Sequence, residues 1–150
     1  MRVEIGAGKN RRPDTDLAID QQPFDGIDIV TDLETGIPLK DNSASKVYAI
    51  HVLEHIRNLP ELMAEIHRIL KPNGILTGKV PHYKDTQAFV DPTHKRFFAI
   101  GSWDYWDRTT VYGNFGYFDV RFRVNYSKRV RRIQFWKPRP IRFELEAIKN

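Results

Sequence analysis

The hydrophobic pattern is most regular between residues 46 and 81, where it predicts a strand, a helix and a second strand. Lys46–Ile50 is a short run rich in β-branched and aromatic residues, as in a buried strand. A helix is expected to begin at Asn58, a common capping residue, and to end at the turn Lys71–Gly74. Its apolar positions have helical spacing: Leu59, Leu62, Met63, Ile66, Ile69 and Leu70. The apolar run Ile75–Val80 follows, which favours two parallel strands joined by a right-handed crossover.

Three shorter strands are predicted before this unit, at Arg2–Ile5, Leu17–Ile19 and Ile27–Val30. The glycine turn Gly6–Asn10 follows the first of them. Only 8 residues separate Gly8 from Leu17, too few for a full crossover helix. We therefore expect a loop or a single helical turn where the first helix of such a fold would lie.

The pattern changes after Pro81. Residues 82–106 are rich in His, Asp and aromatic side chains without a clean period, and short helices are expected near Asp85–Val90 and Ser102–Trp106. Further strands are predicted at residues 118–124, Arg132–Trp136 and Ile141–Ala147, as antiparallel additions at a sheet edge. The expected fold is one α/β domain over residues 1–150. It has a Rossmann-like, mostly parallel twisted sheet with antiparallel C-terminal strands and a reduced first helix.

Composition narrows the chemistry. The sequence contains no cysteine, which excludes disulfides, thiolate catalysis and Cys-ligated metal centres. It shows no signal peptide and no apolar run of membrane length, so we expect a cytoplasmic protein without a membrane partner. The sequence does not indicate an oligomeric state.

Charge is distributed unevenly. Residues 1–120 hold 14 Lys and Arg against 17 Asp and Glu, whereas residues 121–150 hold 10 against 2. Basic side chains that alternate with Phe135 and Trp136 could bind nucleic acid. The alternative is that these charges line the solvated face of edge strands and prevent edge pairing.

The ends of the predicted strands carry the candidate chemistry. The glycine turn follows the first strand, Asp20 ends the second, Asp32 follows the third, and His51 begins the turn after the fourth. In an open parallel sheet these ends form the ligand-binding edge. An acid after the second strand can accept hydrogen bonds from a ribose diol, and one after the third can accept from an adenine amino group. We therefore expect an adenosine-shaped site.

Three segments carry a resemblance to a known family. They are His51–His55 (His-Val-Leu-Glu-His), Leu70–Gly74 (Leu-Lys-Pro-Asn-Gly) and Asp91–Phe98 (Asp-Pro-Thr-His-Lys-Arg-Phe-Phe). With the strand order, the first two resemble class I S-adenosylmethionine-dependent methyltransferases over about residues 2–81, and the third resembles a segment found in a subset of that family. The resemblance implies S-adenosylmethionine as cofactor and methyl transfer to an unidentified small-molecule or macromolecular acceptor.

The resemblance also implies roles for individual residues. Glu4, Gly6, Ala7 and Gly8 would cradle the methionine part of the cofactor, and Asp20, with Gln21 beside it, would bind the ribose hydroxyls. Asp32 and Leu33 would border the adenine, and His51 would lie near the methyl group. His82 and Tyr83 would face the acceptor. The chain departs from the family pattern at Asn10, which replaces a glycine, in its missing first helix and in its short tail.

Histidines after the fifth strand are candidates for acid–base chemistry, because an imidazole titrates near neutral pH. His94 and His82 are the candidate catalytic residues, with Asp91 as an orienting partner. The same side chains with Asp85 could bind a divalent ion, but their spacing matches no tight ligand pair, so we expect no metal site. Two other functions stay open: a non-catalytic cofactor-binding relative that acts as a partner or regulatory module, and a nucleic-acid-binding module that uses the basic C-terminal strands.

Overall fold

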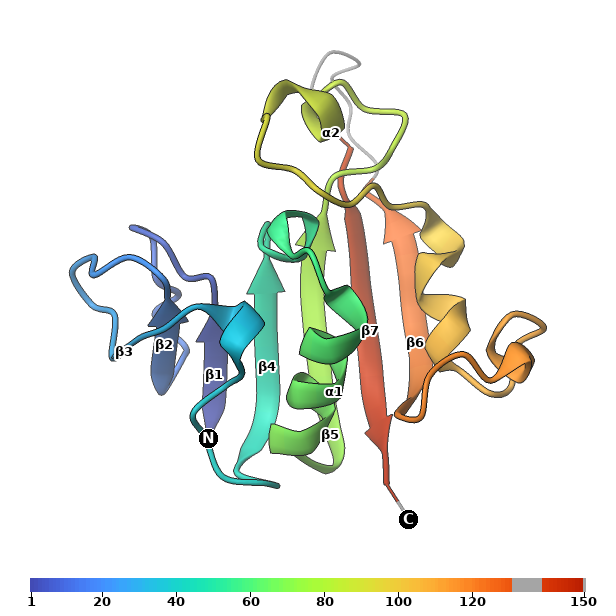
Figure 1. Cartoon of the computed structure of the whole chain (residues 1–150), viewed down its shortest axis with the longest axis horizontal. Coiled ribbons are helices and arrows are strands. Elements are labelled where there is room, and N and C mark those ends of the chain that lie inside the picture. The colour runs from blue at the N-terminus through green and yellow to red at the C-terminus, as the bar shows by residue number, and fades with distance from the viewer. Residues whose placement is uncertain (131–138, 150) are drawn as a thin grey trace.

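A single mixed sheet organises the chain in the computed structural model, which describes residues 1–130 and 139–149 (Figure 1). Within these residues the sheet has seven strands in the order β3-β2-β1-β4-β5-β7-β6. The strands are β1 (Arg2–Ile5), β2 (Leu17–Asp20), β3 (Ile29–Val30), β4 (Ala44–Ile50), β5 (Leu70–Val80), β6 (Arg121–Arg129) and β7 (Ile141–Ile148).

The first five strands are parallel, and β7 and β6 add to β5 in antiparallel pairing. The strand order reverses at β1, which lies between β2 and β4. Ligands of open α/β sheets bind at such a reversal, beyond the carboxyl ends of the strands. The predicted fold class is therefore confirmed, including the antiparallel C-terminal strands.

The strand–helix–strand unit forms as predicted, with α1 spanning Leu59–Ile69. Asn58 occupies the N-cap position, but its side chain makes no capping hydrogen bond and instead donates to Glu61 Oε2 at 2.6 Å. At the other end Asn73, with φ 61°, supplies the left-handed residue of the turn. Pairing of β5 already begins at Leu70, and a register shift follows before Ile75.

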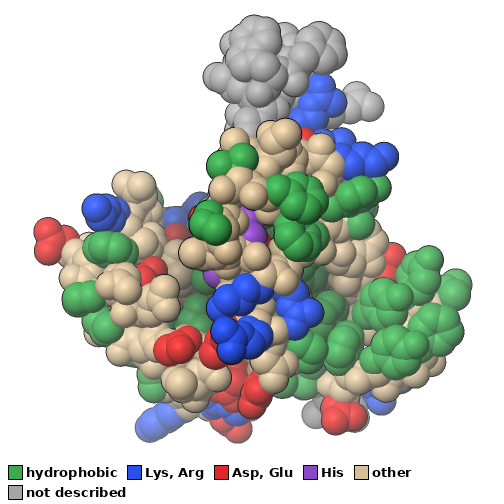
Figure 2. Space-filling model, turned by 45° about the horizontal axis from the view of Figure 1, so that its top comes forward, with side chains coloured by type: hydrophobic (Ala, Val, Ile, Leu, Met, Phe, Trp, Pro, Cys, Tyr) green, Lys and Arg blue, Asp and Glu red, His purple; other side chains and the backbone are tan. Residues whose placement is uncertain are grey.

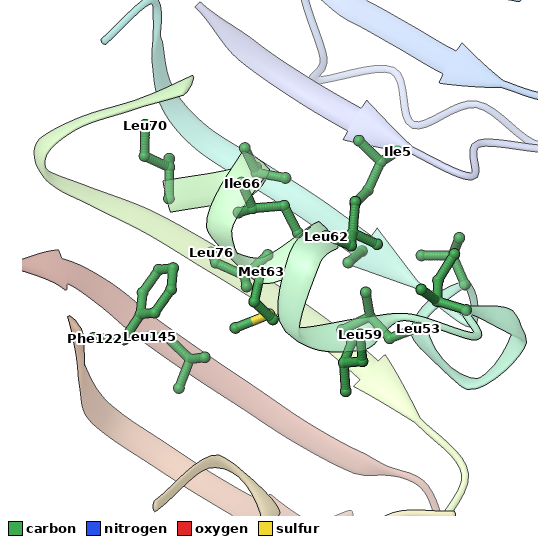
Figure 3. Packing of buried hydrophobic residues seen from close by; sticks show 14 of the residues in the cluster. Ile5, Leu53, Leu59, Leu62, Met63, Ile66, Leu70, Leu76, Phe122 and Leu145 are labelled. Atoms are coloured by element: carbon green, nitrogen blue, oxygen red, sulfur yellow. The ribbon is translucent and has the colours of Figure 1, made fainter. Parts of the chain in front are cut away.

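Helix α1 covers one face of the sheet, and its apolar stripe contacts side chains from β1, β5 and β7. Figure 3 shows Leu62, Met63 and Ile66 directed toward the sheet side chains Ile5, Leu76 and Leu145. All six are at most 2% exposed. This layer is the main hydrophobic core.

A second covering element, the 3₁₀ helix η3 (Ile100–Trp106), packs on the same face over the antiparallel strands. Its Trp103 is fully buried, and its ring centroid lies 4.1 Å from that of Phe143 on β7. The sheet has room for this aromatic pair because Gly78 lies beside Phe143 on β5, where an added Cβ would be 2.5 Å from the ring.

The opposite face of the sheet is polar. Tyr48, Thr77 and Glu144 lie side by side across β4, β5 and β7, in register on this face. The structure describes every residue between β1 and β3, and no helix forms there. The loop after β1 covers part of this face, with the Arg12 guanidinium 4.3 Å from the centre of the Tyr48 ring. The reduced first helix is thus confirmed. Strand β4 is buried on both faces at Val47, Tyr48 and Ala49, as its composition predicted, although a loop and not a helix covers Tyr48.

The remaining elements are short. They are η1 (Leu33–Thr35), η2 (Leu53–His55), α2 (Gln87–Val90) and η4 (Gly113–Phe115). Strand β6 begins at Arg121, later than predicted, and a register shift between Val124 and Tyr126 interrupts its alternation. The predicted strand Arg132–Trp136 lies outside the described residues.

His67 on α1 is a partly buried titratable group near the C-terminal end of the chain. Its Nε2 lies 3.2 Å from the carbonyl oxygen of Ile148, and its ring meets Phe122 edge-on. Burial lowers the pKa of the His67 imidazole below its ordinary value, and the charge of Lys149 acts in the same direction. The folded state therefore resists protonation of His67.

This gives a pH-dependent contribution to stability. Below about pH 6.5 the unfolded chain binds a proton that folded His67 resists, so the free energy of unfolding should fall as the pH decreases. In His67→Gln, which keeps an N–H donor for Ile148, this decrease should be smaller. Urea unfolding of both proteins at about pH 7.5 and about pH 5.5 measures the difference. His82, whose pKa is also lowered by burial, is present in both. An identical pH dependence would contradict the prediction.

Candidate functional site

Four strand-end residues line one pocket of about 680 Å³ at the carboxyl edge of the sheet: Gly6, Asp20, Asp32 and His51. Gln21 and Leu33, two other predicted cofactor residues, line the same pocket. Figure 2 shows histidine side chains within a recess of the surface. The structure thus brings six predicted residues together around a single space.

The glycine turn after β1 has two left-handed residues, Gly6 with φ 64° and Gly8 with φ 58°. A Cβ on Gly6 would lie 2.4 Å from Val52 Cγ2, so only glycine fits between this turn and the turn after β4. At Gly8 no heavy atom lies within 4 Å of a built Cβ. The first glycine is therefore required by packing, and the second adjoins open space.

Asp20 joins the glycine turn to the end of β2. Its Oδ2 accepts a hydrogen bond from the backbone N–H of Gly8 at 2.8 Å, and its Oδ1 accepts one from Gln22 at 2.9 Å. A carboxylate has about four acceptor positions, so both oxygens keep capacity for a ligand. Asp20 is buried in the protein yet borders the pocket.

Asp32 caps the short helix η1, where its Oδ1 accepts from the backbone N–H of Glu34 at 2.9 Å. This fixes the carboxylate at the pocket edge, next to the buried Leu33. Capping and ligand binding are compatible, because capping uses one oxygen.

Glu4 and Ala7 do not line this pocket, and neither does Gly8. Glu4 is buried, and its Oε2 accepts from the backbone N–H of Arg12 at 2.7 Å. Burial raises the pKa of the Glu4 carboxyl, and the hydrogen bond from Arg12 opposes this. Glu4 thus holds the loop that takes the place of the first helix.

A second pocket, of about 540 Å³, adjoins the first, and His51 and His55 line both. Its lining includes the predicted residues His94 and Asp91. His51 has φ 54°, uncommon for a residue other than glycine, and this sharp turn after β4 places it between the two pockets.

The imidazole of His94 is held by the backbone. Its Nδ1 donates to the carbonyl oxygen of Ala88 at 2.9 Å, which leaves the Nε2 lone pair available. Asp91 Oδ2 is 3.9 Å from that Nε2, beyond hydrogen-bond distance. Asp91 Oδ1 instead accepts hydrogen bonds from the backbone and hydroxyl of Thr93.

His82 lines neither pocket. It is 5% exposed, and its Nδ1 accepts a hydrogen bond from the backbone N–H of Lys84 at 3.1 Å. Burial lowers the pKa of this imidazole, and the charge of Arg129 acts in the same direction. Its neighbour Tyr83 is 44% exposed.

Glu54 and His55 were not among the predicted site residues, but the structure places both on the wall of the second pocket. Thr93 and Lys95 also line the first pocket, together with Gly6 and Asp20. The available signal was the His-Val-Leu-Glu-His turn itself, where three ionisable residues follow one strand end.

Several described residues of the basic tail are paired. Arg129 contacts Asp85 Oδ1 at 2.8 Å, and Arg123 lies 3.5 Å from Glu146. Within the described ranges, the molecule has no helix of the length and apolarity needed to cross a membrane.

Comparisons with known proteins identify the fold and assign one segment of the sequence to a family model. The family model described as "Methyltransferase domain" matches residues 8–77. A search of curated proteins finds no significant match. The recognition made from the sequence is confirmed: fold and matched segment are those of class I S-adenosylmethionine-dependent methyltransferases, and S-adenosylmethionine is the cofactor of this class.

Solved structures share the fold at low identity. A chain of the complex between the Haloferax volcanii Trm112 methyltransferase activator and a methyltransferase has a TM-score of 0.71 at 15% identity, covering 99% of this chain and 82% of that chain. An S-adenosylmethionine-dependent methyltransferase from Aquifex aeolicus has a TM-score of 0.64 at 13% identity, covering 98% of this chain and 81% of that chain. The methyltransferase CalH, in complex with S-adenosylhomocysteine, has a TM-score of 0.60 at 14% identity, covering 97% of this chain and 51% of that chain.

Proposed function

We propose that this protein transfers a methyl group from S-adenosylmethionine, bound in the pocket of Gly6, Asp20, Asp32 and His51, to a nucleophile in the adjoining pocket. The convergence of these four strand ends on one space carries the proposal. The volume of about 680 Å³ lies in the range of about 300–1,000 Å³ that is usual for ligand pockets.

The residues present fit the cofactor. Asp20 retains acceptor capacity for two ribose hydroxyls, and Asp32 has an oxygen left for an amino group beside Leu33. Gly6 brings backbone without a side chain to the pocket wall, which allows close approach of a ligand. Bound S-adenosylmethionine supplies a methyl group that is already activated by its positive sulfur.

The protein would act mainly by positioning. His51 and His55 border both pockets, so the acceptor pocket opens onto the methyl end of the cofactor pocket. Holding two reactants in line replaces much of the entropic cost of their encounter. The lone pair of His94 Nε2 is available to receive the proton that an acceptor hydroxyl or amine loses.

The missing first helix bears on this proposal, since a helix N-terminus normally favours an anionic ligand group. Here Asp20 restrains the glycine turn through Gly8, and Glu4 restrains the following loop through Arg12. These contacts hold the turn without a helix.

Calorimetric titration with S-adenosylmethionine and S-adenosylhomocysteine tests the cofactor site, with one equivalent of each expected to bind. Formation of S-adenosylhomocysteine in the presence of a panel of amines, phenols and RNA tests turnover. Failure of both ligands to bind would refute the proposal. Binding without turnover on any acceptor would favour the non-catalytic relative.

A further inference from the structure

Glu54 is a buried carboxylate that is only half satisfied. The residue is 1% exposed, and its Oε1 accepts a hydrogen bond from His51 Nδ1 at 3.2 Å. Its Oε2 is buried and has no hydrogen-bond partner. A buried carboxylate oxygen without a partner is costly, and proteins normally compensate it with a donor or a cation.

Two imidazoles beside Glu54 are held in the tautomer that a metal ion requires. His94 Nδ1 donates to the carbonyl of Ala88 at 2.9 Å, so its Nε2 carries the lone pair. Thr93 uses its hydroxyl proton on Asp91 Oδ1 at 2.6 Å, so it accepts from His55 Nδ1 at 2.9 Å. His55 Nε2 therefore also carries its lone pair. Outer hydrogen bonds of this kind orient metal-ligating histidines.

The cluster is assembled by backbone contacts between distant segments. The carbonyl oxygen of Glu54 accepts from the backbone N–H groups of Lys95 and Arg96, at 2.7 and 3.1 Å. This fixes the segment that carries His94 against the turn that carries Glu54 and His55. The two imidazole rings meet edge to face at 4.7 Å. One potential ligand atom from each of Glu54, His55 and His94 lies within 4.8 Å of the other two.

We propose that Glu54, His55 and His94 bind a divalent first-row transition-metal ion in the wall of the acceptor pocket. Two imidazoles and one carboxylate suit Zn²⁺ and its neighbours better than Mg²⁺ or Ca²⁺. Three protein ligands leave a coordination position open, as in catalytic zinc sites. The set differs from the one that the sequence suggested, because His82 is buried elsewhere and Asp85 is paired with Arg129.

This inference deepens the proposed function, and a catalytic role for the metal ion rests on that function. His94 would then be a metal ligand and not the proton acceptor. All three ligands line the pocket that His51 shares with the cofactor site, so an open position on the ion would be reached from that pocket. An acceptor oxygen bound there would be oriented toward the methyl group and would lose its proton to water more easily. The substrate class is thus an acceptor with a hydroxyl or a similar oxygen donor.

The test uses the metal-free full chain, titrated with Zn²⁺, Co²⁺ and Mg²⁺ in competition with a chromophoric chelator. One equivalent of Zn²⁺ or Co²⁺ should bind, with Mg²⁺ far weaker. Glu54→Gln and His94→Gln should each reduce Zn²⁺ affinity at least about tenfold. His67→Gln, a histidine substitution on α1, should leave it unchanged. Thermal unfolding identifies any variant that fails to fold, and Zn²⁺ should raise the melting temperature of the wild type but not of Glu54→Gln.

Absence of stoichiometric binding by the folded wild type would overturn the metal site, as would Zn²⁺ affinity that is equal in wild type, Glu54→Gln and His94→Gln. S-adenosylhomocysteine binding, measured on the same samples, separates this result from the proposed function. Metal binding that depends on Glu54, without cofactor binding, would leave the metal site standing and refute the methyltransferase role.

Discussion

Gly6→Ala is expected to reduce the free energy of unfolding by about 3 kcal/mol and to abolish measurable cofactor binding. A left-handed conformation costs a residue with a Cβ roughly 1–2 kcal/mol, and overpacking a tight interior adds about 1–3 kcal/mol. Both costs apply, because Gly6 has φ 64° and its added Cβ would be 2.4 Å from Val52 Cγ2. Val52 lies in the turn after β4, so relief of this clash would separate the turns that border the cofactor pocket. Urea unfolding and titration with S-adenosylhomocysteine measure the two effects.

Gly8→Ala is the matched control for this prediction. Gly8 has nearly the same φ, 58°, but a Cβ there meets no atom within 4 Å. Gly8→Ala should therefore reduce the free energy of unfolding only by the backbone strain, roughly 1–2 kcal/mol. Equal destabilisation by the two substitutions would show that contact with Val52 does not constrain the turn.

Asp20→Ala is expected to weaken binding of S-adenosylhomocysteine by more than about 100-fold. Each hydrogen bond to a charged group is worth about 1.5–3 kcal/mol, so loss of two ribose contacts costs about 3 kcal/mol or more. The substitution also releases the backbone N–H groups of Gly8 and Gln22 that Asp20 now holds. Calorimetric titration measures the affinity.

Asp16→Ala provides the comparison. Asp16 lies at the opposite end of β2, where it pairs with Arg2 at 3.0 Å, and it does not line the pocket. Its substitution should leave the affinity unchanged. If Asp20→Ala binds S-adenosylhomocysteine as tightly as Asp16→Ala does, the ribose placement is wrong.

The sequence predicted the parts of the fold that local patterns determine. The spacing of Leu59, Met63 and Ile66 specified α1, because a helix without such a stripe would have no face to bury. The acids at Asp20 and Asp32 could be placed at one edge, because parallel strands end on the same side of a sheet.

The acceptor side could not be predicted in the same way. His94 reaches Glu54 because the segment after β5 folds back and its backbone N–H groups at Lys95 and Arg96 bind the Glu54 carbonyl. Those hydrogen bonds involve residues about forty positions apart and have no side-chain pattern. For the same reason, His82 and His94 looked equivalent in the sequence, although only His94 reaches the pocket.

The start of β6 was also misplaced, because Phe118 and Val120 already show the alternation of a strand although pairing begins only at Arg121. The burial of β4 was predicted, but the element that covers its second face was not. Tyr48 is buried there beneath the loop after β1, and its hydroxyl donates to Asp14 in that loop.

The one-sided covering of the sheet has a consequence for protein design. The strand-end pocket is lined by turns and by the short helices η1 and η2, and neither α1 nor η3 contributes a residue to it. The pocket wall therefore does not depend on a helix over the polar face, so a helix or fused domain could be added beyond the loop after β1 without replacing a pocket residue.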